Sequence, residues 1–178
     1  MKKVQRKQLI AILILLLVSL ACIIISAVKV SREDPYLRLK NNLEKDNGLE
    51  YTNSYIVFRT SEGDKRVEVE VADSADKRTL GLMFRERLED GSGILFIFDT
   101  EVDHPFWMKN TLIPLDMIFI GGSDQVVALI ENATPCEKDP CTRYFPGEKY
   151  DRVVEVNSGW VGENGVEVGD PVVITQAP

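Results

Sequence analysis

The sequence predicts a mostly β domain of the α+β class: a small, antiparallel, barrel-like curled sheet with one or two short helices, preceded by one N-terminal transmembrane helix. About seven short apolar runs, separated by turn-forming residues, indicate the strands. The sequence contains no strand–long helix–strand unit, which disfavours a doubly wound parallel sheet. An uncharged run of 20 residues near the N-terminus indicates the transmembrane helix.

This uncharged run covers residues 9–28 and would span about 30 Å as a helix, which matches the hydrocarbon core of a bilayer. The four positive charges that precede it are Lys2, Lys3, Arg6 and Lys7. Positive flanks stay in the cytoplasm, so we expect residues 1–8 to be a cytoplasmic stub and the chain after the helix to be extracytoplasmic. A cleaved signal peptide, which gives a secreted form, and a lipid anchor on Cys22 are the alternatives.

Charge divides the rest of the chain into two parts. Residues 29–53 carry five positive and five negative side chains and are predicted to form a polar spacer. Residues 54–178, the predicted folded domain, carry 12 Lys and Arg against 23 Asp and Glu, a net charge of −11. Such a surface repels nucleic acid and anionic lipid headgroups, which excludes both as partners of the folded domain. Membrane contact is therefore predicted for residues 9–28.

The folded domain begins with a predicted hairpin. Residues 55–60 and 66–73 are apolar-rich runs around a polar, glycine-containing turn. Valines alternate with glutamates in the second run, which predicts a strand with one buried and one wet face. A short helix is predicted over residues 74–84, with Asp73 or Ser74 as its cap.

Further strands and a second short helix complete the domain. The continuous apolar content of residues 93–99 and 115–122 predicts buried strands. A Gly-Gly-Ser-Asp turn joins the second of these to residues 125–133 and makes the clearest hairpin in the chain. A strand over 150–159, a turn or helix over 159–165 and a last strand after a Gly-Asp turn follow.

Cys136 and Cys141 lie in a loop with two prolines and four polar residues. Outside the cytoplasm, neighbouring cysteines usually form a disulfide, and closing so short a loop contributes about 2 kcal/mol. The C-x4-C spacing differs from the C-x-x-C of redox enzymes, and no second Cys or His pair is present in the sequence to complete a zinc site. We therefore predict a structural disulfide.

One loop concentrates the side chains that could carry chemistry. It contains the only histidine of the chain and is stiffened by Pro105 and Pro114. Binding groups concentrate on loops that a rigid scaffold holds in place. The candidate binding residues of this loop are His104, Trp107, Lys109, Asn110 and Asp116, of which His104, Lys109 and Asp116 are also candidate catalytic residues.

The first four candidates each have a functional and a structural interpretation. His104 acts as a general acid or base, or it bonds the backbone beside the proline that follows it. Trp107 stacks on a sugar or another planar-faced ligand, or it packs in the core. Lys109 and Asn110 donate hydrogen bonds to an anionic or hydroxylated ligand, or they stabilise the loop.

Asp116 begins an apolar strand, so an inward-facing carboxylate there needs a partner. Lys109 is the expected partner. Asp116 is then either one half of a structural ion pair or a catalytic carboxylate. Asn157 and Trp160 form a second polar–aromatic cluster at a strand end. In one interpretation the two residues complete a pocket with the loop. In the other, Asn157 caps a turn and Trp160 covers the mouth of the barrel.

Several standard sites are disfavoured by the sequence. A single histidine excludes a multi-histidine zinc site. An oxygen-only calcium site made of Asp99, Asp103 and Asp116 is the remaining metal alternative. Ser92 and Ser158 lack the G-x-S-x-G elbow of a catalytic triad, and no phosphate-cradling glycine-rich loop occurs in the sequence. We predict no metal and no cofactor.

Five segments of the chain, in unbroken order over about residues 66–175, resemble the prokaryotic family called domain of unknown function 192. They are VADSADKRTLGLMFRERL, GILFIFD, HPFWMKNTLIPLDMIFI, ENATPCEKDPC and VVEVNSGWVGENGVEVGD. The resemblance implies a compact, mostly β, barrel-like domain that is often secreted or anchored. It implies no activity and no catalytic residues. The membrane segment and the spacer lie outside it.

Three functions remain compatible with the sequence. We favour a non-catalytic extracytoplasmic module that binds a small ligand, a glycan, an envelope component or an envelope protein, because the aromatic and polar loop lacks a complete catalytic set. The first alternative is an extracytoplasmic enzyme that uses His104 and Asp116 for acid–base chemistry, or Lys109 as an electrostatic clamp. The second is a structural or assembly factor without a small-molecule site. The sequence leaves the oligomeric state open.

Overall fold

The computed structural model describes residues 19 and 49–176. Among them, no helix is long and apolar enough to cross a membrane. The predicted stub, nearly all of the predicted membrane segment and most of the predicted spacer lie outside the described residues. The elements in chain order are β1 (Thr52–Thr60), β2 (Gly63–Ala72), α3 (Ala75–Leu80), β3 (Ser92–Val102), β4 (Phe106–Trp107), β5 (Leu115–Ile120), β6 (Val126–Ala133), β7 (Arg143–Tyr144), β8 (Tyr150–Asn157), α4 (Trp160–Asn164) and β9 (Val172–Gln176).

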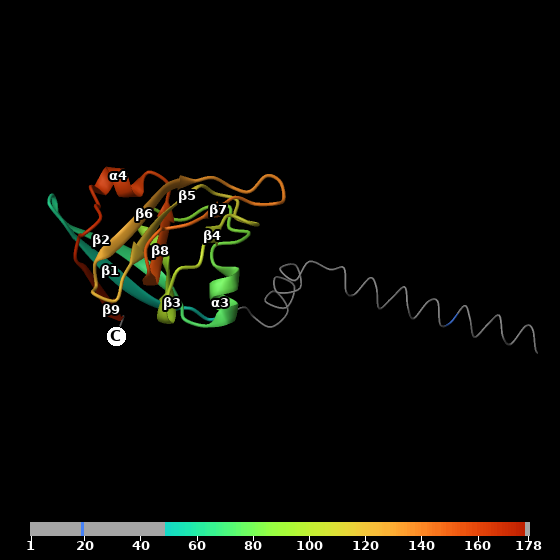
Figure 1. The fold of residues 1–178 in the computed structure, drawn as a ribbon, viewed down its shortest axis with the longest axis horizontal. Coiled ribbons are helices and arrows are strands. Elements are labelled where there is room, and N and C mark those ends of the chain that lie inside the picture. The colour runs from blue at the N-terminus through green and yellow to red at the C-terminus, as the bar shows by residue number, and fades with distance from the viewer. Residues whose placement is uncertain (1–18, 20–48, 177–178) are drawn as a thin grey trace, which may run out of the picture. The chain divides into compact units, whose positions relative to one another are not determined.

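A curled seven-stranded sheet in the order β6-β5-β8-β3-β2-β1-β9 forms the centre of the domain (Figure 1). Both predicted hairpins are confirmed: β1 pairs with β2, and β5 pairs with β6, in antiparallel fashion. Two parts of the fold prediction are wrong. The sheet is not fully antiparallel, because β2 and β3 run parallel. A parallel pair requires a crossover, and the segment that contains α3 supplies it.

The sheet is also not closed into a barrel. Its two edge strands, β6 and β9, meet through one isolated bridge between Gln125 and Pro171 and through three backbone hydrogen bonds. These run from Val126 to Asp170 at 3.0 Å, from Gly169 to Val126 at 2.8 Å and from Val172 to Asp124 at 2.8 Å. These contacts lie where β6 and β9 begin, and the two strands do not pair along their length. The curl therefore brings the edges together at one end without forming the continuous ladder that a barrel requires.

Two apolar clusters lie on opposite faces of the sheet, because side chains alternate along each strand. On β8, Val154 and Val156 belong to the first cluster, together with residues of β1, β2 and β9. Val153 belongs to the second cluster, and Glu155, two residues further along the strand, faces the same side. The second face is covered by side chains from the crossover and from the segment around β4.

The helix α3 is shorter than the predicted 74–84. Ser74 caps it as predicted, because the side-chain oxygen of Ser74 accepts a hydrogen bond of 3.3 Å from the backbone of Lys77. The helix ends at Gly81, where φ is +48° and a Cβ atom would lie 3.1 Å from the ring of Phe96. This glycine lets the chain turn away from the helix axis while staying close to β3. The second predicted helix is confirmed as α4.

Candidate functional site

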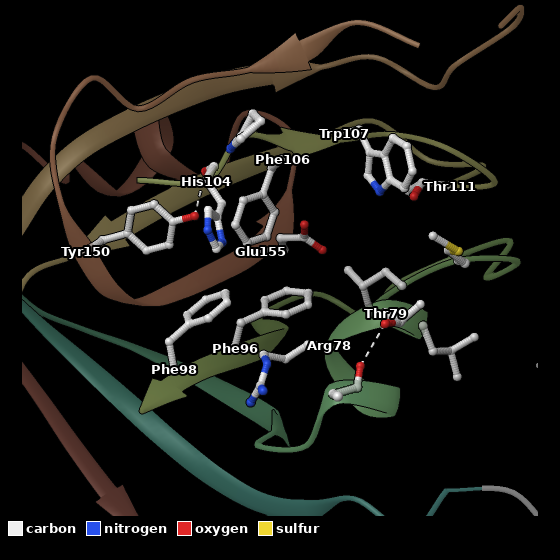
Figure 2. Close-up of a pocket in the computed structure, with 16 residues that line it drawn as sticks. Arg78, Thr79, Phe96, Phe98, His104, Phe106, Trp107, Thr111, Tyr150 and Glu155 are labelled. Atoms are coloured by element: carbon white, nitrogen blue, oxygen red, sulfur yellow. Dashed lines mark hydrogen bonds between the residues drawn. The ribbon is translucent and has the colours of Figure 1, made fainter. Parts of the chain in front are cut away.

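A pocket of about 360 Å³ lies over the second face of the sheet, between α3 and the segment that carries β4 (Figure 2). One wall is formed by α3 and the turn after it, and the opposite wall by residues 104–107 and Thr111. The strands β3 and β8 supply the remaining lining. The residues that line the pocket are Ala75, Arg78, Thr79, Leu80, Gly81, Leu82, Met83, Phe96, Phe98, His104, Pro105, Phe106, Trp107, Thr111, Tyr150 and Glu155.

Glu155 is the buried acidic residue of this pocket. It extends from the central strand β8, is 6% exposed, and Figure 2 shows its carboxyl at the centre of the lining side chains. Among the described residues, no group makes a hydrogen bond or ion pair with this carboxyl, and its oxygens keep some contact with the open space of the pocket. Burial raises the pKa of Glu155 to about 8 because the charged form is poorly solvated. The pocket therefore presents a carboxyl that is mostly protonated at neutral pH and has no protein partner among the described residues.

Aromatic rings pack around this carboxyl in edge-to-face pairs. The centroids of Phe96 and Phe106 are 5.4 Å apart at an interplanar angle of 86°, and those of Phe98 and Tyr150 are 5.6 Å apart at 80°. Phe106 also lies 6.1 Å from Tyr150, so the rings form one connected wall. Such interlocking pairs hold each ring in a fixed orientation. The apolar wall is therefore rigid, and it explains why the carboxyl is poorly solvated.

The other polar groups of the lining are held by backbone contacts. One terminal nitrogen of Arg78 donates to the carbonyl oxygens of Asp73 at 2.9 Å and Ile97 at 2.8 Å, which ties α3 to β3. The hydroxyl of Tyr150 donates to the carbonyl of His104 at 2.7 Å and fixes the segment that leads into β4. Burial raises the pKa of Tyr150 to about 12, so this donor keeps its proton. Both side chains therefore shape the pocket by holding in place the backbone segments that surround it.

The structure brings two of the sequence candidates, His104 and Trp107, into this pocket. Figure 2 shows them at opposite ends of it, with His104 beside Tyr150 and Trp107 beside Thr111. Trp107 is 39% exposed, so it is positioned at the mouth and is not a core residue. For these two residues the pocket is compatible with the functional interpretation.

Lys109 and Asn110 lie outside this lining. The ammonium of Lys109 is 3.3 Å from the carboxylate of Asp139, in the loop that carries the two cysteines. Asn110 adopts a positive φ of 57°, and its carbonyl accepts a hydrogen bond of 2.8 Å from the backbone of Phe84. These contacts fit the structural interpretation, in which both residues stabilise the loop.

Asp116 is fully buried, and its carboxylate is satisfied by backbone N–H groups. It accepts hydrogen bonds from Asn132 at 2.8 Å, Gly159 at 2.9 Å and Val161 at 3.0 Å. The expected ion pair with Lys109 is therefore wrong: the partners of Asp116 are amides of β6 and of the turn into α4. The three backbone donors satisfy both carboxyl oxygens of Asp116 and join three segments of the chain. This arrangement leaves Asp116 no role in the pocket around Glu155.

Asn157 and Trp160 also lie away from the pocket lining. The side-chain amide of Asn157 donates to the carbonyl of Leu88 at 3.0 Å. The ring of Trp160 packs 5.7 Å from that of Phe58, against the first apolar cluster. Of the two interpretations of this pair, the one in which it completes a pocket with the 103–116 loop does not fit the described residues, because Trp160 packs on the other face of the sheet.

The predicted disulfide is present, with Cys136 and Cys141 bonded at an S–S distance of 2.05 Å. Within the described part of the chain, the only group of His, Cys, Asp or Glu side chains close enough to hold a metal ion is this pair with Asp139. Both sulfur atoms are engaged in the disulfide, so they are poor metal ligands. The calcium alternative built on Asp99, Asp103 and Asp116 does not form such a group.

The residue that sequence reasoning missed is Glu155. It lies in the run VVEVN, where the alternation with valine suggests a solvent-facing position. The structure shows why this inference fails: β8 is a central strand between β5 and β3, and both of its faces are covered. A usable signal was the apolar run on both sides of the glutamate, which is typical of a strand buried on two faces.

Comparisons with known proteins give a family and a fold but no activity. The model of the family DUF192, described as uncharacterized ACR, matches residues 57–174. The crystal structure of a "putative transcription regulator" from Sinorhizobium meliloti is 31% identical, with a TM-score of 0.64 over 71% of this chain and 96% of that chain. A protein of unknown function from Novosphingobium aromaticivorans has the same identity and TM-score over 71% of this chain and 86% of its own. No curated protein matches.

Proposed function

The chain belongs to the DUF192 family, and we propose that its domain is an extracytoplasmic module that binds a small ligand in the pocket around Glu155. One observation carries the proposal: a buried carboxyl lies at the centre of a 360 Å³ pocket without a partner among the described residues. The volume lies in the range of small-molecule sites, and the lining combines an aromatic wall with polar side chains, as such sites do.

The energetic cost of Glu155 supports this interpretation. A buried polar group without a hydrogen bond costs a few kcal/mol relative to one in water. A leucine or methionine at this position would avoid the cost and fill part of the space. A ligand that supplies the missing partner offsets this cost and orders itself against the aromatic wall.

The extracytoplasmic placement rests on two features of the sequence and one of the structure. Residues 9–28 are uncharged and follow a basic stub, and they are long enough for a membrane anchor. The Cys136–Cys141 bond fits an oxidising compartment.

The net charge of −11 on residues 54–178 disfavours contact with DNA, so the description of the Sinorhizobium meliloti relative does not transfer to this chain.

The pocket can be tested by filling its mouth. Thr79→Trp places a large side chain on the α3 wall, whereas Asp76→Trp adds the same side chain to the same helix outside the lining. A fragment collection is screened against the full chain by thermal shift and by ligand-observed NMR. We expect ligands that bind the wild type and Asp76→Trp and fail to bind Thr79→Trp. Ligands that bind all three proteins equally would place the site elsewhere.

A second candidate function is an enzyme in which Glu155 acts as a general acid. A carboxyl whose pKa is raised to about 8 holds a proton at neutral pH, and His104 lines the same pocket. The pair that the sequence suggested, His104 with Asp116, is not assembled, since Asp116 is engaged by backbone amides. Chemical change of a bound ligand, lost in Glu155→Gln while binding persists, would favour this candidate over simple binding.

A further inference from the structure

Some polar side chains that face the pocket are engaged in hydrogen bonds within the protein, and one is not. The guanidinium of Arg78 donates to two carbonyl oxygens, and the hydroxyl of Tyr150 donates to a third. The hydroxyl of Thr79 donates to the carbonyl of Ala75 at 2.7 Å. The carboxyl of Glu155 is the charged group at the centre for which the described residues provide no donor. The pocket therefore offers a ligand one carboxyl without a protein partner among the described residues, which becomes a negatively charged acceptor when its proton leaves.

The surroundings of this carboxyl favour a positive ligand group. Figure 2 shows the Glu155 carboxyl beside Phe106 and near Phe96, while the guanidinium nitrogens of Arg78 point away from it. Aromatic rings attract cations through their π electrons, and a desolvated site strengthens that attraction. The guanidinium of Arg78 lies 5.4 Å from the ring centroid of Phe98, so one ring of the pocket already has a cation over it. An ammonium group at the Glu155 carboxyl would lie beside the remaining rings, Phe96 and Phe106.

The field of the whole domain acts in the same direction. Residues 54–178 carry a net charge of −11. A surface of one sign concentrates ions of opposite sign and raises their association rate, most strongly at low ionic strength. Small cations would therefore be enriched around the domain as a whole and small anions depleted.

We propose that this pocket selects a small organic cation, an ammonium group attached to an apolar body, with the carboxylate of Glu155 as its counter-ion and the rings of Phe96, Phe106 and Trp107 as its apolar seat. This inference rests on the proposed function of the pocket as a ligand site. A volume of about 360 Å³ lies at the small end of ligand pockets and suits a compact molecule. A divalent metal ion fits poorly, because it requires several oxygen ligands and the lining supplies one carboxylate.

Binding of a cation requires the ionised form of Glu155, so the proton must leave as the ligand enters. Apparent affinity should therefore rise about tenfold for each pH unit between pH 6 and pH 7 and level off above pH 8. The other titratable groups that face the pocket are Arg78 from α3, His104 from the segment before β4 and Tyr150 from β8. Histidine is the only one of these side-chain types that ordinarily changes charge in this range, so His104→Gln is the control for the pH profile.

Three probes of one size test the charge preference: benzylamine, benzyl alcohol and benzoate. Binding to the full chain is measured at pH 8 by calorimetry or ligand-observed NMR. We expect benzylamine to bind at least tenfold more tightly than benzyl alcohol, and benzoate to bind most weakly. Glu155→Gln should lose at least tenfold in benzylamine affinity and leave benzyl alcohol unchanged. Glu148→Gln removes the same charge from an exposed position and should leave both affinities within a factor of two.

The outcomes separate this inference from the proposed function. Equal binding of benzylamine and benzyl alcohol, blocked by Thr79→Trp and insensitive to Glu155→Gln, overturns the cation preference and keeps the pocket as a ligand site. The cation preference is also overturned, with the pocket retained, if the three probes fail to bind while the fragment screen yields ligands blocked by Thr79→Trp. Failure of both the probes and the screen overturns both proposals.

Discussion

The pH dependence of folding stability reports directly on Glu155. Burial raises the pKa of its carboxyl from 4.5 to about 8. Between these values the folded protein holds a proton that the unfolded chain has released, so the free energy of unfolding falls as the pH rises from about 5 to about 8. At about 1.36 kcal/mol per pKa unit, this group alone removes about 5 kcal/mol across that range if the pocket does not relax.

Glu155→Gln replaces the carboxyl with a neutral amide of the same shape and abolishes this proton linkage. At pH 5 the variant and the wild type should have nearly equal stability, because both side chains are then neutral. At pH 8.5 the variant should be more stable by at least about 2 kcal/mol, since water entering the pocket recovers part of the solvation of the wild-type charge. In a domain of this size that difference raises Tm by about 6–10 °C.

The assay is urea unfolding at pH 5, 6.5 and 8.5, followed by the fluorescence of Trp107 and Trp160, with the slope against urea concentration held common. Glu148→Gln removes an exposed carboxylate and is the control for the change in net charge. Parallel pH profiles for the wild type and Glu155→Gln would show that the Glu155 carboxyl is solvated in the folded protein. Glu155 would then not be a desolvated, unpartnered carboxyl, and the proposed ligand pocket would lose its main support.

Three further perturbations separate fold from site. Asp116→Ala should cost about 4 kcal/mol in urea unfolding, because it leaves three backbone donors without their charged acceptor; a loss below about 1 kcal/mol would contradict its structural role. Replacing Cys136 and Cys141 by serine should cost about 2 kcal/mol, and in the native protein these two cysteines should resist alkylation until their disulfide is reduced. The coupling between Lys109 and Asp139, measured in the same assay by a double-mutant cycle with alanine at both positions, should be below about 1 kcal/mol because the carboxylate of Asp139 is exposed, and a larger coupling would contradict this.

Local signals in the sequence were sufficient for the hairpins and the disulfide. The turn Gly121-Gly122-Ser123-Asp124 and the valine–glutamate alternation of β2 each depend on residues close in the chain, and both predictions are confirmed. The parallel pairing of β2 with β3 was not predictable in the same way. It depends on where the crossover returns the chain, and the short α3 gave no helical periodicity long enough to indicate a crossover.

The candidate site was predicted only in part for a related reason. His104 and Trp107 stood out as rare residue types in a stiffened loop, and the structure places both in the pocket. The opposite wall comes from α3 and the carboxyl from β8, which are distant in sequence from that loop. Sequence spacing conveys no information about such contacts unless the sheet order is known, and the order depended on the crossover that was not recognised.

Two buried carboxyls on adjacent strands show why Glu155 is a better site candidate than Asp116. Asp116 lies opposite Val156, and Glu155 lies opposite Met117, so the two acids are neighbours in the β5–β8 ladder whose side chains face opposite sides of the sheet. The fold surrounds Asp116 with three backbone donors, which satisfy both of its carboxyl oxygens. It surrounds Glu155 with aromatic rings and a pocket, and it provides no donor from the described residues. Among the described residues, the fold thus provides hydrogen-bond donors for one buried carboxyl and none for its neighbour on the next strand. The missing partner of Glu155 fits a position that a ligand completes. A cationic ligand group would supply Glu155 with the hydrogen-bond donors that Asp116 obtains from the backbone.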